Sequence, residues 1–92
     1  MEDVIETRSQ TELNRLRWRS RRGMAELDVL FVPFFEEAFD ALNAEMKEVY
    51  ARMLDEEDPE LWSWFSEQSA PNDLQYRSLV SLMLNRVRPN DS

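Results

Sequence analysis

The sequence predicts an all-α fold, a small antiparallel bundle of four to five helices in a single domain. Apolar residues recur at helical spacing in several segments, and no segment alternates as a strand would. The chain has 92 residues, the length of one domain. A hydrophobic content of 42%, with 5 Phe, 3 Trp and 2 Tyr, is too high for a disordered chain. We therefore expect one modest core.

The first helix is predicted over about residues 10–22. Ser9 and Glu12 have the spacing of a capping box, in which a serine lies at the N-cap and a glutamate lies three residues later, in the first turn of the helix. Gly23, the single glycine, is expected to end this helix as its C-terminal cap.

Two faces of this first helix are predicted. The inward face carries Leu13, Leu16 and Ser20. Trp18 lies opposite them, beside two arginines, a composition typical of binding hot spots. The alternative is that Trp18 is buried because the helix is sandwiched or irregular.

The second segment, residues 24–42, has the apolar stripe of a buried helix. Pro33 interrupts it and is expected to kink it, or to break it into two helices near Val32, since proline removes a backbone donor. The phenylalanines of this segment are interpreted as core rather than as a ligand pocket. They are Phe31, Phe34, Phe35 and Phe39.

Three further helices follow, each with a start signal. Asn43 is expected to cap a third helix, and Asp58 followed by proline to cap a short fourth helix over about residues 59–67. In that helix Trp62 is expected to be partly exposed. Asn72 or Asp73 is expected to cap the last helix, which Pro89 ends.

The domain organisation follows from these segments. Residues 1–10 are predicted to be a flexible N-terminal extension, residues 11–88 a single helical-bundle domain, and residues 89–92 a C-terminal tail. The longest apolar run, residues 29–35, is far shorter than the ~20 residues of a membrane span. The N-terminus has no secretory signal, so a cytoplasmic protein is expected.

Composition excludes much of the usual chemistry. Without Cys or His, the chain has no thiol nucleophile, no Ser-His-Asp relay and no Cys or His ligands for zinc. With one Gly it cannot contain either glycine-built phosphate loop. Acidic pairs such as Glu36 and Glu37, and the run 55–58, are interpreted as solvated surface rather than as catalytic or cation sites. We therefore expect neither an active site nor a tightly bound cofactor or metal.

Charge is distributed unevenly along the chain, whose net charge is −8. Six of its eleven basic residues are arginines that precede Gly23, and the remainder is strongly acidic. One interpretation is a solvated helix face whose arginines pair with the domain's own acids. The alternative is a binding face for a protein, or for nucleic acid or another anionic partner.

The segment around Gly23 is the most distinctive part of the sequence. Arg22 and Glu26 flank the glycine, which permits close approach of another backbone, so a partner protein could press onto this turn. The structural alternative is a plain connection between two helices with a local ion pair between Arg22 and Glu26.

Here the sequence resembles a known family. The residues 18–28, WRSRRGMAELD, together with PFFE at 33–36 and DPELWSW at 58–64, resemble the SdhE family of bacterial flavinators, related to mitochondrial succinate dehydrogenase assembly factor 2. The family hallmark R-G-x-x-E is matched by Arg22, Gly23 and Glu26, and the resemblance covers about residues 11–87. The departures are the longer acidic N-terminal extension and Trp62.

The resemblance implies a five-helix assembly factor rather than an enzyme. Such a protein promotes covalent attachment of FAD to the flavoprotein subunit of succinate dehydrogenase, and in some bacteria of fumarate reductase. FAD and the histidine that bonds to it belong to the partner. A monomer when free is expected, with neither nucleic acid nor membrane as a partner.

The resemblance also implies a partner-binding surface at the turn. Arg22 is expected to be a charge-assisted anchor, Gly23 the point of close approach, and Glu26 the partner of a basic group near the flavin. The rim candidates are Trp18, Arg19 and Arg21, and the set is completed by Met24 and Asp28.

Overall fold

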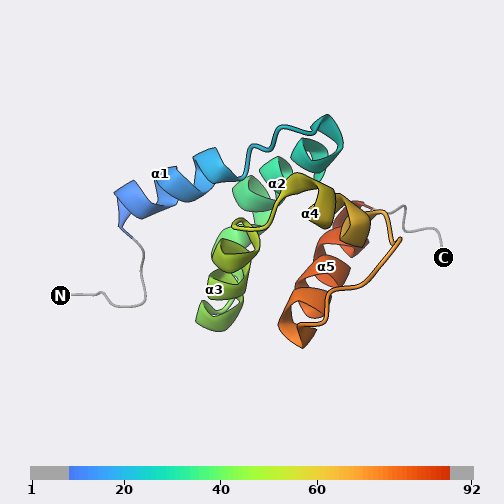
Figure 1. Cartoon of the computed structure of the whole chain (residues 1–92). Helices are drawn as coiled ribbons and strands as arrows, with labels where there is room; N and C mark the ends of the chain where they lie inside the picture. The colour runs from blue at the N-terminus through green and yellow to red at the C-terminus, as the bar shows by residue number, and fades with distance from the viewer. Residues whose placement is uncertain (1–8, 88–92) are drawn as a thin grey trace.

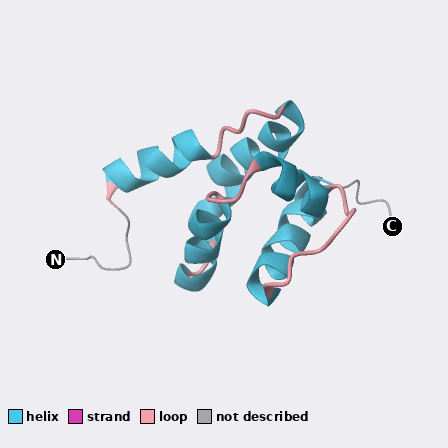
Figure 2. Cartoon of the chain, viewed as in Figure 1, coloured by secondary structure: helices cyan, strands magenta, loops and turns pink. Residues whose placement is uncertain are grey.

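The computed structural model describes residues 9–87, which form five α-helices and one 3-10 turn, with no strand in this range (Figure 2). The predicted all-α bundle is confirmed. Most of the two predicted tails lies outside the described residues, and so does Pro89. The elements are α1 (Gln10–Arg19), α2 (Ala25–Ala38), η1 (Phe39–Ala41), α3 (Ala44–Met53), α4 (Asp58–Phe65) and α5 (Leu74–Val87).

The second helix holds the bundle together. α2 packs against α1, α4 and α5, and α3 packs against α5, beside which it lies in Figure 1. α1 extends to one side of the other helices, so that much of its surface faces solvent (Figure 1). Within residues 9–87 no helix is both long and apolar enough to cross a membrane.

Tyr50 of α3 lies at the centre of the aromatic core and is fully buried. Its ring centroid is 5.5–6.2 Å from those of four phenylalanines, in stacked and tilted arrangements that aromatic quadrupoles favour. These rings are Phe31, Phe34, Phe35 and Phe39, all buried, which confirms their interpretation as core.

The first helix begins as predicted and ends earlier. The Ser9 side chain accepts a hydrogen bond from the backbone N–H of Glu12 at 3.1 Å, so the helix starts at Gln10, within the stretch predicted to be a flexible extension. It ends at Arg19 rather than at residue 22, and Gly23 does not have the positive φ of a glycine cap. The reason is tertiary, since the N–H groups of Arg22 and Gly23, which would continue the helix, donate instead to the carboxylates of Asp28 and Asp58.

The second helix continues through Pro33, and the predicted break near Val32 does not form. Pro33 is exposed, as is Val29, whose carbonyl loses the donor that proline lacks. Water can therefore hydrate that carbonyl, and the helix tolerates the proline. α2 ends at Ala38 rather than at residue 42, and η1 completes the segment.

The start signals of the last three helices have different outcomes. The Asn43 side chain caps α3 at 2.8 Å from the Met46 N–H, and Asp73 caps α5 at 2.8 Å from the N–H of Gln75, as predicted. The prediction for Asp58 is wrong, because its carboxylate does not cap its own helix. α4 begins at Asp58 itself and ends at Phe65, and Trp62 in this helix is half-buried, as expected.

Candidate functional site

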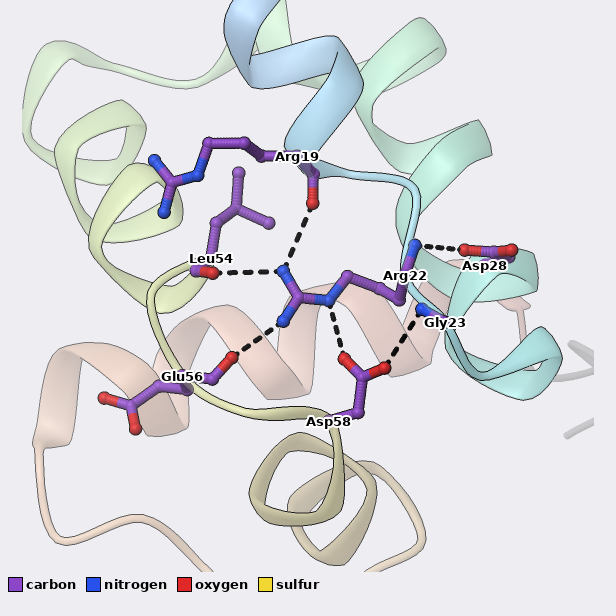
Figure 3. A network of polar contacts seen from close by, with 7 residues as sticks. All are labelled: Arg19, Arg22, Gly23, Asp28, Leu54, Glu56 and Asp58. Atoms are coloured by element: carbon purple, nitrogen blue, oxygen red, sulfur yellow. Dashed lines mark hydrogen bonds and ion pairs between the residues drawn. The ribbon is translucent and has the colours of Figure 1, made fainter.

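The link between α1 and α2, residues 20–24, is here called the Arg22 turn. It passes beside the loop that joins α3 to α4, so two connections far apart in sequence meet at one corner of the bundle (Figure 3). The turn starts at buried Ser20, whose hydroxyl also donates to the Leu16 carbonyl at 2.8 Å. The turn is thereby anchored to the core at its first residue.

The guanidinium of Arg22 lies between these two connections. It donates to the Arg19 carbonyl at 3.2 Å, the Leu54 carbonyl at 3.0 Å and the Glu56 carbonyl at 2.7 Å. Its Nε donates to Asp58 Oδ1 at 2.8 Å. The Arg22 side chain is only 12% exposed, so these charge-assisted bonds are largely shielded from water.

Two carboxylates hold the backbone on either side of Arg22. The Arg22 N–H donates to Asp28 of α2, and the Gly23 N–H donates to Asp58 Oδ2 at 3.0 Å (Figure 3). Both peptide groups that flank Arg22 are therefore fixed by side chains. The predicted alternative of a local pair between Arg22 and Glu26 is not formed, because Arg22 pairs with Asp58.

Gly23 is exposed, and its own fold does not require a glycine. Its φ is not positive, so a residue with a side chain could adopt the same backbone. A Cβ built on Gly23 would lie 3.4 Å from Asp58 Oδ2, an ordinary contact distance. A requirement for glycine at this position would have to come from outside the chain.

Four of the eight predicted site residues are exposed: Trp18, Arg21, Gly23 and Glu26. Trp18 is 73% exposed, which settles the open question of its burial. Within residues 9–87 the side chains of Arg21 and Glu26 have no hydrogen-bond or ion-pair partner. Within the described residues these groups are therefore exposed to solvent, where another molecule could meet them.

The other four predicted residues contact their own chain. Arg22 and Asp28 hold the turn, Arg19 pairs with exposed Asp55, and Met24 is half-buried against the core. The expected anchor, Arg22, thus uses its donors inside the molecule.

A hollow of ≈ 370 Å³ lies between α1 and α2 beside the turn. Val32 and Phe35 are its apolar residues from α2, and Trp18 and Arg21 line it from the side of α1. It therefore extends the exposed surface of the turn with an apolar depression next to an exposed aromatic ring.

Three of the six arginines that precede Gly23 pair with acids of the same domain. Arg17 pairs with Glu36, Arg19 with Asp55 and Arg22 with Asp58. This pairing favours the solvated-face interpretation over an anionic ligand. In the described part of the chain no three acidic side chains gather as metal ligands would.

Tyr50 contacts the first residue of the Arg22 turn from the core, through the Ser20 hydroxyl. Burial raises the pKa of its phenol well above the ordinary value, outweighing the hydrogen-bond contact with Ser20 and the charge of Arg22, which lower it. The phenol therefore stays protonated and neutral at physiological pH, and supplies a fixed hydrogen bond rather than a titrating group.

Asp58 is the residue at this corner that the sequence did not link to the Arg22 turn. Its position before a proline predicts a cap, and no local pattern links it to Gly23, which lies 35 positions earlier. The only available signal was the DPELWSW stretch itself, which carries the resemblance without assigning a role to its aspartate.

Comparison of the sequence with known proteins shows the family to which the chain is similar. A family model described as the flavinator of succinate dehydrogenase matches residues 14–87. The FAD assembly factor SdhE of Pseudomonas putida is 49% identical over 80 residues, covering 87% of this chain and 95% of the relative. The FAD assembly factor SdhE of Pseudomonas aeruginosa is 44% identical over 81 residues, with 88% and 96% covered. That of Colwellia psychrerythraea is 45% identical over 74 residues, with 80% and 81% covered.

Proposed function

Because this chain belongs to the family of flavinators of succinate dehydrogenase, it assists the attachment of FAD to that enzyme, and we propose that it does so by docking through the Arg22 turn on the flavoprotein subunit. Docking would favour the flavoprotein conformer in which its histidine can bond to the flavin. Differential affinity for that conformer is sufficient to promote the reaction.

The observation that carries this proposal is the state of Gly23. It is exposed, and neither its φ nor the space around it requires a glycine. Glu26, in the first turn of α2, is also exposed and has no partner within residues 9–87. A close-approach point beside a carboxylate that has no partner among the described residues suits a partner protein that supplies a basic group.

The rim of the proposed docking surface is the hollow between α1 and α2. Trp18 offers a large apolar ring with a polar N–H, and Arg21 offers an unpaired cation within the described residues. Tryptophan and arginine are the residue types that dominate the binding energy of protein interfaces. Arg22 contributes indirectly, by holding the turn.

In this proposal FAD is held by the flavoprotein, and this chain supplies no reacting group and binds no FAD tightly. The sequence has no Cys or His to act as a nucleophile, and its one Gly excludes a glycine-built phosphate loop. We further propose that the chain acts as a monomer in the cytoplasm, and that the flavoprotein of fumarate reductase is a second partner.

The test measures covalent flavin by fluorescence of the flavoprotein bands on a denaturing gel. Cells that lack the gene are complemented with the natural chain, Gly23→Leu, Glu26→Ala or Glu60→Ala. Glu60 is the matched control, because it is also an exposed glutamate in the first turn of a helix. We expect the fluorescent bands to be lost with the first two variants and kept with the third.

Circular dichroism of each purified variant shows whether it is folded. Bands of equal brightness with folded Gly23→Leu and Glu26→Ala would contradict docking through the turn. A fumarate reductase band that stays bright without the gene would remove the second partner.

A further inference from the structure

Asp58 fixes the Arg22 turn from the start of α4, and this assigns it a role in docking. We propose that Asp58 is a positioning residue, which holds Gly23 and Glu26 in the arrangement that the flavoprotein recognises. The inference rests on the proposed function, because it concerns how the same surface is presented.

The carboxylate of Asp58 is not used by its own helix. Glu57 occupies the N-cap position of α4 and makes no side-chain cap, and Asp58 follows it as the first residue of the helix. Asp58 points instead across to the Arg22 turn (Figure 3). Its side chain is 24% exposed, so the contact is partly shielded from water.

The two oxygens of Asp58 bind two different parts of the turn. Oδ1 accepts from Arg22 Nε at 2.8 Å, and Oδ2 accepts from the Gly23 N–H at 3.0 Å. The first contact joins two connections of the bundle and supports the fold. The second fixes the peptide group that leads into Gly23, the exposed point of the turn.

This second contact matters for docking more than for folding. Gly23 is exposed, so its N–H could be hydrated if Asp58 released it, and folding would lose little. The turn would then sample several conformations, and Glu26, three residues further on, would lose its fixed relation to Gly23. A partner would have to order the turn on binding, which weakens affinity.

The experiment measures the affinity of the purified flavoprotein subunit for the full chain by isothermal titration calorimetry. Asp58→Asn removes the charge, and Asp58→Glu keeps the charge but displaces the carboxylate by one methylene. For both variants we expect affinity weakened by about tenfold or more, the effect of losing one charge-assisted hydrogen bond that orders the site. Thermal unfolding of each variant fixes a working temperature at which it is fully folded.

The two variants separate positioning from folding. The glutamate of Asp58→Glu can still pair with Arg22, but its displaced carboxylate is not expected to bond the Gly23 N–H at the same time. This variant should therefore stay folded even if Asp58→Asn does not. The matched control is Asp73→Asn, which removes an aspartate charge at the start of α5, away from the turn. The control should bind as the natural chain does.

Each outcome has one meaning. Natural affinity of folded Asp58→Glu, and of Asp58→Asn where it folds, would overturn the positioning role, and so would an equal loss with Asp73→Asn. The proposed function is tested separately by Gly23→Leu and Glu26→Ala in the same titration. If those two lose binding and the Asp58 variants keep it, only the positioning role fails; if those two also bind normally, the docking surface itself is wrong.

Discussion

The starts of α4 and α5 each have an aspartate that forms an ion pair with an arginine, but the two aspartates bond different backbone groups. Each has an aspartate paired with a distant arginine, Asp58 with Arg22 and Asp73 with Arg52. Asp73 also accepts the N–H of Gln75 in its own helix, at 2.8 Å. Asp58 accepts an N–H from the other connection of the bundle. An aspartate thus caps α5 from the position before that helix, whereas at the first position of α4 an aspartate ties two loops together.

The burial of the arginine accounts for the difference. The Arg22 and Asp58 side chains are 12% and 24% exposed and 2.8 Å apart, whereas those of Arg52 and Asp73 are 47% and 37% exposed and 3.4 Å apart. A guanidinium surrounded by backbone carbonyls needs a carboxylate close by, because water cannot compensate its charge. The carboxylate of Asp58 therefore pairs with Arg22 instead of bonding its own helix, whereas Asp73, next to the more exposed Arg52, still caps its own helix.

The largest expected effect comes from removing the buried arginine. Arg22→Ala leaves the Asp58 carboxylate unpaired and takes the donor from three carbonyls. We expect the free energy of unfolding to fall by about 3 kcal/mol, the usual cost of breaking a partly buried, hydrogen-bonded ion pair. Urea denaturation followed by circular dichroism measures it.

The matched variant at the other helix start is Arg52→Ala. Arg52 is half exposed, so the loss should stay below about 1 kcal/mol, as for other surface ion pairs. Equal losses for the two variants would show that burial does not distinguish the two helix starts.

A smaller effect is expected from pH at the start of α5. The pKa of Asp73 lies below its ordinary value of 3.8, first because the Gln75 N–H donates to its carboxylate, with further help from Tyr76 and Arg52. Since the folded pKa is below the unfolded one, the carboxylate stabilises the fold above the unfolded pKa. That contribution is lost as the pH falls through the folded pKa.

Asp73→Asn removes this titration while keeping a residue type that caps helices. At neutral pH the variant should therefore be less stable than the natural chain, by less than Arg22→Ala. At acid pH, as the pH falls through the folded pKa and the carboxylate becomes protonated in the folded state as well, the difference should shrink. Urea midpoints at the two pH values test this, and a difference that does not change with pH would contradict it.

Local rules predicted much of the fold. The caps at Ser9, Asn43 and Asp73, the aromatic core and the half-buried Trp62 all depend on spacing within a few residues, and all are present. The predicted end of the first helix and the predicted cap at Asp58 were wrong, because both depend on tertiary partners. The first helix ends early because the Arg22 and Gly23 N–H groups bond Asp28 and Asp58.

The residues of the proposed site were open to prediction only in part. The R-G-x-x-E pattern directs attention to the turn, and helical geometry put Trp18 opposite the inward face but left its burial open, which the structure resolves as exposure. The inward role of Arg22 could not be read from the sequence, because its acceptors include Leu54 and Asp58, which lie more than thirty positions away. A motif residue can therefore serve a surface without forming part of it.

The smallest expected effect on stability comes from Gly23→Ala, and it bears directly on what the Asp58 contact requires. The glycine φ is not positive, and the new Cβ would lie 3.4 Å from Asp58 Oδ2, so a methyl group fits beside the contact between Asp58 and the Gly23 N–H. Alanine also restricts the unfolded chain, and the free energy of unfolding should rise by at most about 1 kcal/mol. Urea denaturation would show a shift of the midpoint upward or none at all. A fall comparable with that of Arg22→Ala would mean that the contact of Asp58 with the Gly23 N–H requires a glycine. The missing side chain at this position would then serve the fold rather than the approach of a partner.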